Sequence, residues 1–275
     1  MSITAIIPVY NEEYRIEATL RCASWCDEII VVDKQSNDRT RDIVARYTDK
    51  IFVIDNREYD PREFDIFLGN ATCEWIILLT ASDVIHPQLA RQIRELTDRP
   101  DFPYDIIRVP FRRYVLGMES TRSPWYSDLH PAVFRRRIAR VKYDDVHSAL
   151  ALDSKREYRM ENSQEACLYH LTHETVDIMM ERHMRYCRAE SKNFSKDISL
   201  RSIFKSVLDA TYRTFFKRKT FLMGWNGIAL SLAYISYFML RFIYIWESRN
   251  SRAAENYGAI RETILKAWSQ NNGKS

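Results

Sequence analysis

Short apolar runs that end in polar residues alternate with amphipathic stretches along the first half of the chain. Such runs are too short for helices and predict strands that are buried on both faces. Apolar residues spaced three and four apart predict helices that cover the sheet, so the pattern as a whole predicts an α/β fold. Strands are predicted in a run beginning at Ile3 and at residues 29–32, 50–54, 75–79 and 104–109, and helices at residues 13–23, 64–73 and 88–96.

Polar clusters follow the first two predicted strands. The first strand ends in Tyr10, Asn11 and Glu12, and the second ends in Asp33. Ligands of open α/β sheets bind at the carboxyl edge of the strands, so an acid at this edge can accept hydrogen bonds from a ribose or a base. The alternative interpretation of Asp33 is an acid that caps a strand-turn-helix corner.

The last third of the chain has a different pattern. Residues 221–240 contain no charge and approach the about 20 residues needed to cross a bilayer. Asn226, two glycines and Arg241 argue against a span, so we expect a helix at about 221–246 that lies in or against the cytoplasmic face of the membrane. A single transmembrane helix and a buried helical hairpin are the alternatives. Basic residues precede the helix and would face anionic headgroups: Arg201, Lys205, Arg213, Lys217, Arg218 and Lys219.

Composition narrows the class of protein. A length of 275 residues can bury the core of one α/β domain plus an appendage. The net charge of +4 is too small to indicate a nucleic-acid-binding protein. Five scattered cysteines without a paired CxxC indicate a reducing cytoplasm rather than disulfides or zinc. The first strand begins at once and leaves no room for a signal peptide, so we expect the protein to stay inside the cell.

Two motifs at the start of the chain closely resemble the opening of family 2 glycosyltransferases, whose fold is called GT-A. They are Ile-Ile-Pro-Val-Tyr-Asn-Glu at 6–12 and Ile-Ile-Val-Val-Asp at 29–33, followed by Ser-Asn-Asp-Arg-Thr at 36–40. The resemblance extends over about residues 3–150. It implies a Rossmann-like nucleotide-diphospho-sugar transferase sheet flanked by helices in residues 1–170, with a helical membrane-associating appendage in residues 171–275. It places Pro8, Tyr10, Asn11, Glu12 and Asp33 in the donor site.

The resemblance also identifies the turn after the fourth predicted strand, Thr80-Ala-Ser-Asp83, as the position of the family's Asp-x-Asp motif. In the family the first acid tends to hold the ribose, and a later acid holds the divalent metal that bridges the diphosphate. Thr80 and Ser82 stand where those acids usually are, and one carboxylate with two hydroxyls is a weak magnesium site. Donor contacts are therefore expected from Thr80, Ser82 and Asp83.

The altered motif leaves three possibilities open. A divalent cation, Mg or Mn, could bind through Asp83 and a distant histidine, the transfer could proceed without metal, or catalysis could be lost while the nucleotide pocket is kept. His147 and His170 are the candidate metal partners of Asp83, with His173 as a further choice. Thr172 or His173 could instead simply introduce the next helix. Asp83 could also be an N-terminal helix acid.

A candidate general base lies in Lys-Tyr-Asp-Asp-Val-His-Ser at 142–148. Bacterial transferases that modify lipopolysaccharide cores, the nearest subgroup, carry Val-His-Glu here, and Ser148 replaces the glutamate. An inverting transfer needs a base to take the proton of the attacking hydroxyl. Asp145 is the first candidate and Asp144 the second, while His147 is either a metal or phosphate contact or a hinge histidine.

The sequence allows two interpretations of each of two basic segments. Arg57 or Arg62, in and after the loop that follows the third strand, could contact the base or a phosphate of the donor, or belong to a solvated loop. His-Pro-Ala-Val-Phe-Arg-Arg-Arg at 130–137 resembles a strand of the family's second half. Its charge could face a diphosphate or an anionic acceptor, or the segment could be a solvated basic edge strand.

The resemblance implies an inverting, hexosyltransferase-like glycosyltransferase. The expected donor is a nucleotide-diphospho-sugar, with a UDP-sugar first, and the expected acceptor is a hydroxyl of a membrane-linked glycan or glycolipid such as a lipopolysaccharide core. We expect the enzyme on the inner face of the cell membrane, with no nucleic-acid partner. The alternative is a catalytically degenerate nucleotide-sugar-binding or scaffolding protein of the same fold, because Thr80, Ser82 and Ser148 replace expected acids.

Overall fold

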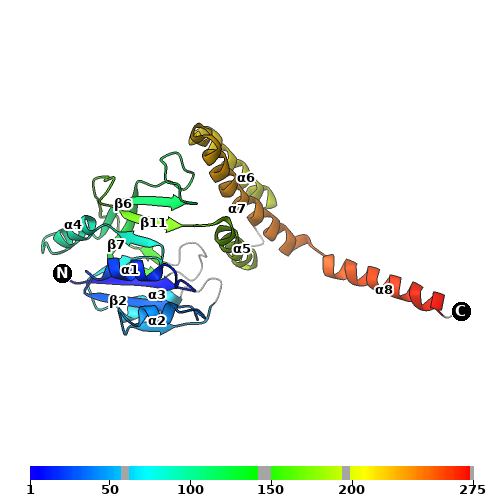
Figure 1. Cartoon of the computed structure of the whole chain (residues 1–275), viewed down its shortest axis with the longest axis horizontal. Coiled ribbons are helices and arrows are strands. Elements are labelled where there is room, and N and C mark those ends of the chain that lie inside the picture. The colour runs from blue at the N-terminus through cyan, green and yellow to red at the C-terminus, as the bar shows by residue number, and fades with distance from the viewer. Residues whose placement is uncertain (57–61, 142–149, 194–198, 273–275) are drawn as a thin grey trace.

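The computed structural model describes residues 1–56, 62–141, 150–193 and 199–272. A mixed sheet flanked by helices forms the larger part, and a helical region follows it toward the carboxyl terminus (Figure 1). Nine strands belong to this sheet among the described residues, and eight of them run in the order β3-β2-β1-β4-β7-β6-β11-β5. The α/β prediction is confirmed.

The first half of the sheet is parallel. β1 (Ile3–Val9) pairs with β2 (Glu28–Asp33) on one side and with β4 (Trp75–Leu78) on the other, and β3 (Ile51–Val53) pairs with β2. Nearly every residue of β1 is buried, as the apolar run predicts for a strand covered on both faces. The carboxyl ends of β1, β2 and β4 therefore meet at one edge.

The second half of the sheet is mixed. β7 (Leu129–Arg135) runs antiparallel to β4 and to β6 (Ile106–Val115), and β11 (Leu168–Thr172) runs parallel to β6. β5 (Asp83–Ile85) pairs antiparallel with β11 at the far edge of the strand order. Because only residues 79–82 join β4 to β5, the sheet curls and brings its far edge back to the carboxyl end of β4.

Shorter elements complete the second half. β10 (Glu157–Arg159) pairs with the first residues of β6, and β8 (Ala139–Val141) pairs with β9 (Leu150–Leu152) in a separate two-stranded sheet. A 3-10 turn at Arg136–Ile138 connects β7 to β8.

The prediction of a solvated basic edge strand at 130–137 is wrong. β7 lies inside the sheet between β4 and β6. Arg135 is 7% exposed; its guanidinium pairs with Glu74 and lies 4.4 Å from the centroid of the Trp75 ring. The Arg137 guanidinium lies 2.7 Å from the Asp105 carboxylate. The charge of Arg135 is therefore neutralised inside the fold, whereas Arg136 and Arg137 are exposed.

Helices cover both faces of the sheet. α1 (Ile16–Ala23) and α4 (Pro87–Thr97) contribute to one apolar cluster, while α3 (Arg62–Asn70) contributes to the other; α2 (Thr40–Val44) is a single short helix beside α1. α1 begins three residues later than predicted. The Glu12 carbonyl accepts from the amides of Arg15 and Ile16, which forms a turn before the helix.

Three helices pack together in the carboxyl-terminal region. α5 (Val176–Asn193) and α6 (Leu200–Tyr212) both contact α7 (Gly224–Asn250), and a π-helical turn at Arg213–Lys217 and a 3-10 turn at Thr220–Met223 connect α6 to α7. Buried Glu190 of α5 pairs with Arg241 of α7. The predicted helix at about 221–246 corresponds to α7.

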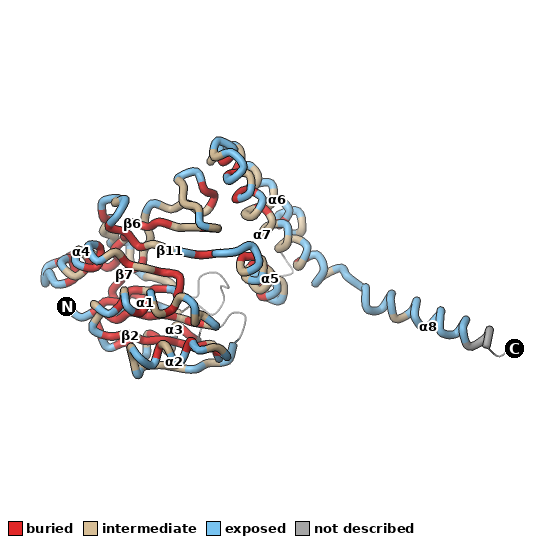
Figure 2. The backbone as a smooth tube through the Cα atoms, in the orientation of Figure 1, coloured by how far each residue is buried: buried red, intermediate tan, exposed pale blue. Residues whose placement is uncertain are grey.

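Residues Thr220–Asn250 are long and apolar enough to cross a membrane by length and composition, and 28% of the apolar window is buried. α8 (Ala253–Asn272) projects away from the other helices, and residues 253–268 are exposed except for Gly258 (Figures 1 and 2). The division of the chain at residue 170 stays a prediction, and the last strand of the sheet, β11, ends at Thr172.

Candidate functional site

The loops that follow β1 and β2 are joined to each other by side-chain hydrogen bonds. The Asn11 amide donates to Ser36 Oγ at 2.9 Å, and the Asn37 amide donates to Asn11 Oδ1 at the same distance. The Glu12 amide donates to Thr40 Oγ1 at 2.7 Å. Asn11 has a left-handed backbone with φ of 52°, a conformation that asparagine tolerates better than most residues. The two motifs of the sequence therefore form one structural unit.

Asp33 lies at the base of this unit. Its side chain is fully buried and accepts hydrogen bonds from the Ser36 amide at 3.1 and 3.2 Å, with Arg41 Nε at 3.5 Å. Asp33 does not line the neighbouring pocket. In this structure its carboxylate holds the turn, and its contact with a donor stays a prediction.

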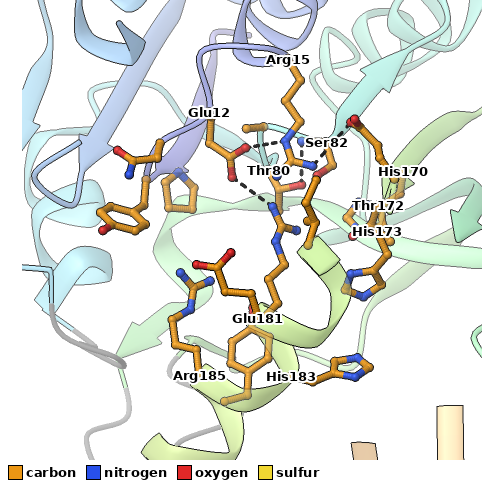
Figure 3. Close-up of a pocket in the computed structure, with 18 of the residues that line it drawn as sticks. Glu12, Arg15, Thr80, Ser82, His170, Thr172, His173, Glu181, His183 and Arg185 are labelled. Atoms are coloured by element: carbon orange, nitrogen blue, oxygen red, sulfur yellow. Dashed lines mark hydrogen bonds and ion pairs between the residues drawn. The ribbon is translucent and has the colours of Figure 1, made fainter. Parts of the chain in front are cut away.

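A pocket of about 780 Å³ opens at the carboxyl ends of β1 and β4 (Figure 3). The structure brings eight of the predicted site residues together in its lining, and adds many residues from α5 and α7. The eight are Pro8, Tyr10, Asn11, Glu12, Thr80, Ser82, His170 and His173. Four other predicted residues, Arg57, Asp144, Asp145 and His147, lie outside the described residues.

The turn at Thr80–Asp83 folds around the Asp83 carboxylate. The Thr80 amide and hydroxyl donate to Asp83 Oδ2 at 2.6 and 2.9 Å. Ser82 is held from the other side, because its carbonyl accepts from the Leu171 amide of β11 at 2.8 Å. Thr80 thus uses its hydroxyl to position the one remaining acid, which is 5% exposed.

Asp83 and His170 contact each other directly. His170 Nδ1 lies 2.7 Å from Asp83 Oδ1. A carboxylate accepts, so the imidazole donates from Nδ1, and only Nε2 is left for another partner. The histidine belongs to β11, and Thr172 ends that strand, so the helix begins only at Val176. The sequence predicts Asp83 and His170 as joint ligands of a metal; in the structure a direct hydrogen bond joins them, and their shared metal stays a prediction.

Asp83 and His170 alone do not fit a divalent cation. Both carboxylate oxygens already have protein partners, which leaves one imidazole nitrogen where Mg²⁺ or Mn²⁺ prefers several oxygens. Among the described residues no group of three or more His, Cys, Asp or Glu side chains is arranged to hold a metal.

Sequence reasoning missed the arginines of the pocket. The Glu12 carboxylate accepts from Arg15, and Arg182 Nη2 of α5 donates to it at 3.3 Å. Burial raises the pKa of Glu12, and the Arg15 guanidinium opposes this shift. The described lining contains four arginines and one lysine, and it contains three glutamates. The spacing of Ile178, Met179, His183, Tyr186 and Cys187 predicts an amphipathic helix, but it does not show which face meets the pocket.

Two further histidines, His173 and His183, line the pocket, and another, His130, lies outside its lining. The His173 and His183 rings are 5.4 Å apart, and burial lowers the pKa of His173 to about 4. His130 stacks on Phe111 with ring centroids 4.8 Å apart, and burial lowers its pKa to about 4 as well. These two imidazoles are therefore neutral at pH 7.

The curled mixed sheet, the helices on both of its faces and the pocket at its carboxyl edge define the GT-A class of sugar transferases. The sequence profile of glycosyl transferase family 2 matches residues 4–151, more than half of the chain. The chain belongs to glycosyl transferase family 2. It is a glycosyltransferase that uses a nucleotide-sugar donor.

Solved structures with a similar fold have low sequence identity to this chain. S. aureus TarS 1–349 in complex with UDP-GlcNAc is 14% identical, with 90% of this chain and 92% of that chain covered and a TM-score of 0.48. Glucosyl-3-phosphoglycerate synthase from Mycobacterium tuberculosis in complex with Mn²⁺, UDP and phosphoglyceric acid is 15% identical, with 50% and 56% covered and a TM-score of 0.37. The family assignment depends on the sequence match alone.

Proposed function

We propose that this enzyme transfers a sugar, with inversion, from a UDP-sugar to a hydroxyl of a membrane-linked glycan of the lipopolysaccharide-core type. One observation carries the proposal. The helix that is long and apolar enough to cross a membrane also supplies Tyr234, Tyr237 and Phe238 to the pocket wall. An acceptor anchored in the membrane would therefore reach the pocket alongside α7.

The donor half of the pocket is the edge formed by the β1 and β4 loops. Pro8, Tyr10 and Asn11 are assigned to the nucleoside, and Thr80 and Ser82 to the region between ribose and diphosphate. Hydrogen bonds to the β2 loop hold the β1 loop, and the Asp83 carboxylate holds the turn after β4, before a ligand arrives. Such preorganisation lowers the entropic cost of binding. Asp33 would reach the nucleoside only if the turn that it holds opens.

The acceptor half is aromatic. Trp125 and Tyr234 meet edge to face with ring centroids 5.0 Å apart, and Tyr186 of α5 also lines the pocket. Aromatic side chains offer flat apolar faces with a polar atom at the edge, which suits the C–H face and hydroxyls of a sugar ring. The acceptor glycan is assigned to this wall, between α5 and α7.

A peripheral position on the membrane is supported by an exposed apolar stripe. Phe204, Leu208, Tyr212 and Phe216 are four residues apart along α6 and the following turn and are 49% to 68% exposed. Exposed basic residues flank the stripe: Arg201, Lys205, Arg213, Lys217 and Lys219. An apolar stripe with flanking positive charge is typical of helices that lie in the interface of an anionic membrane. Residues 171–275 would then be the membrane-associating region of the enzyme.

The transfer requires a base that takes the acceptor's proton. Asp145, with Asp144 second, remains the proposed base. Glu181 of α5 is a pocket-lining carboxylate among the described residues and is the alternative. Replacing each by its amide separates the candidates, since loss of the base lowers turnover by roughly a hundredfold or more without abolishing donor binding.

The test is release of UDP from a panel of UDP-sugars, offered with lipooligosaccharide in vesicles or with the matching free oligosaccharide. We expect UDP release that depends on the vesicle-bound acceptor, and an inverted anomeric configuration in the product by NMR. UDP binding without release under any condition would indicate a degenerate enzyme. Absence of UDP binding would overturn the donor assignment.

A further inference from the structure

Three neighbouring strands place Arg113, His170 and Asp83 in one row across the sheet. In the pairing of β11, His170 is opposite Arg113 of β6 on one side and opposite Asp83 of β5 on the other. Arg113 and His170 line the pocket, whereas Asp83 lies behind them. The position at which the family usually presents carboxylates to a metal is therefore next to a fixed guanidinium.

Arg113 has little to neutralise it within the described residues. Its Nε is buried and has no hydrogen-bond partner there, and its Cζ lies 5.3 Å from the centroid of the Phe111 ring. Asp83 attracts the guanidinium, but the oxygens of Asp83 are already bonded to Thr80 and His170. A mostly buried cation without a hydrogen-bonded counter-ion is costly, so this position favours an anionic ligand.

The other arginines come from α5 and from the start of α1. Figure 3 shows Arg15 joined to Glu12, with Arg185 and Glu181 of α5 below them in the view. Arg15 and Arg182 share the Glu12 carboxylate, while Arg185 has no carboxylate within ion-pair distance among the described residues. Two guanidiniums, those of Arg113 and Arg185, therefore remain available to a ligand that enters the pocket.

We propose that Arg113 and Arg185, supported by Arg15 and Arg182, bind the diphosphate of the donor and neutralise its charge in place of a divalent cation. This inference rests on the proposed use of a nucleoside-diphosphate sugar. Guanidiniums match phosphate oxygens in paired hydrogen bonds and keep their charge at any physiological pH.

The same arrangement explains the altered acidic motif. Without a cation between them, carboxylates at positions 80 and 82 would repel a diphosphate in the pocket. The hydroxyls of Thr80 and Ser82 remove that repulsion, and Thr80 holds Asp83 away from the pocket. The uncharged Thr80 and Ser82 and the arginines of the pocket then both favour a diphosphate that is bound without a cation.

The chemical role follows from the charge that moves during transfer. The bond between the anomeric carbon and the β-phosphate oxygen breaks, and its electron pair stays on the departing diphosphate. The acceptor oxygen forms the new bond to the anomeric carbon and gives its proton to the base. The leaving group gains one negative charge, and fixed guanidiniums beside it stabilise that charge in the transition state.

The experiment is calorimetric binding of UDP, UMP and uridine to the full chain, in EDTA and again with Mn²⁺. We expect UDP to bind in EDTA more tightly than UMP, with little change on adding Mn²⁺. Arg113→Met and Arg185→Met should each weaken UDP binding roughly tenfold to a hundredfold, since each removes charge-assisted hydrogen bonds. Uridine binding should change little. Arg91→Met, an exposed arginine of α4 outside the pocket, is the matched control.

The outcomes separate this inference from the proposed function. UDP binding that requires Mn²⁺, with the requirement lost in Asp83→Asn, would overturn the inference and leave the donor assignment intact. UDP affinity unchanged in both arginine variants would overturn it equally. Failure of UDP to bind under all conditions would overturn the proposed donor itself. Arg113→Lys keeps a positive charge and should retain part of the affinity, which provides a second variant should Arg113→Met fail to fold.

Discussion

His170 Nδ1 lies 2.7 Å from Asp83 Oδ1, and this bond joins two strands whose residues are 87 positions apart in the chain. The other oxygen of Asp83 accepts from the amide and the hydroxyl of Thr80. The carboxylate thus fixes both the turn after β4 and the orientation of an imidazole that faces the pocket. An acid that resembles a metal ligand in the sequence acts here as the centre of a hydrogen-bond network.

Replacing Asp83 by asparagine tests this network. The amide keeps the shape of the carboxylate but must direct its NH₂ group toward either Thr80 or His170, both of which donate. We expect the free energy of unfolding to fall by about 1–3 kcal/mol. The His170 tautomer should shift as well, because Nδ1 loses its acceptor when the NH₂ group faces it.

Urea unfolding and the ¹⁵N shifts of the imidazole measure the two effects. Asp101→Asn, at an exposed position, is the control and should change neither. Unchanged stability together with an unchanged tautomer in Asp83→Asn would show that the carboxylate does not hold the turn.

The parallel half of the sheet could be predicted because its signals are local. Each of β1, β2 and β4 is a mostly apolar run that polar residues follow, and burial on both faces produces that pattern directly. The position of β7 could not be predicted in this way. Its basic end indicates an exposed edge, whereas Arg135 is buried through its pairs with Glu74 and Asp105, which come from distant segments.

The pocket residues also fall into two groups, those that could be predicted from the sequence and those that could not. The residues of the β1 loop and the β4 turn follow from two contiguous motifs, and the structure brings them together. The arginines of α5 reach the pocket only through tertiary packing, which an amphipathic pattern does not encode. The pairing of His170 with Arg113 and Asp83 depends on the register of three strands, and no short-range signal fixes that register.

Replacing Gly227 by alanine is predicted to destabilise the fold. A Cβ at this position would lie 1.8 Å from the Thr220 carbonyl oxygen, because the turn before α7 folds back onto the helix. Ser231 Oγ, which donates to the Gly227 carbonyl, lies 2.6 Å from Thr220 Oγ1, so the backbone cannot move away without breaking this chain. We expect Gly227→Ala to lower the free energy of unfolding by about 1–3 kcal/mol.

Gly258→Ala in α8 is the matched control, since nothing lies within 4 Å of its added Cβ. It should raise helix stability by about 0.5–1 kcal/mol, the usual difference between alanine and glycine in a helix. Circular dichroism during urea unfolding measures both variants. Equal stability of Gly227→Ala and wild type would mean that the turn does not pack on α7.

Stability should fall in mild acid because the half-buried His130 is neutral in the folded protein. Burial lowers the pKa of His130 to about 4, below the value of about 6.5 in an unfolded chain. The unfolded state therefore binds the proton first, so the contribution of neutral His130 is complete above pH 6.5 and is lost as the pH falls toward 4. His130 alone contributes a slope of about 1.4 kcal/mol per pH unit in this window.

His130→Phe should reduce that slope while keeping the stacked contact with Phe111. The stability that is lost when Glu28 becomes protonated provides an internal reference at lower pH. Burial raises the pKa of Glu28, but hydrogen bonds from Lys50, Thr4 and Thr72 outweigh it and lower the pKa to about 2. The Glu28 contribution is lost only between pH 4.5 and 2, and His130→Phe should leave it unchanged. An unaltered slope between pH 6.5 and 4 in this variant would contradict the assignment.

The apolar stripe of α6 gives the sharpest prediction about the membrane. The double variant Tyr212→Glu with Phe216→Glu removes two adjacent stacked rings, whose centroids are 5.7 Å apart, and adds negative charge. We expect its affinity for phosphatidylglycerol vesicles to fall roughly tenfold or more, because it loses apolar burial and attraction to anionic lipid. Val53→Glu, at an exposed apolar position on β3, is the control and should bind as wild type does.

Co-sedimentation with vesicles measures this affinity. Carbonate extraction distinguishes a peripheral enzyme from one whose α7 crosses the bilayer. A peripheral enzyme should be released by carbonate and should bind phosphatidylcholine vesicles weakly, since its basic residues need anionic headgroups. Resistance to extraction, with no effect of the double variant, would instead mean that α7 crosses the bilayer. The aromatic residues that α7 gives to the pocket would then lie at the membrane surface because the helix is embedded.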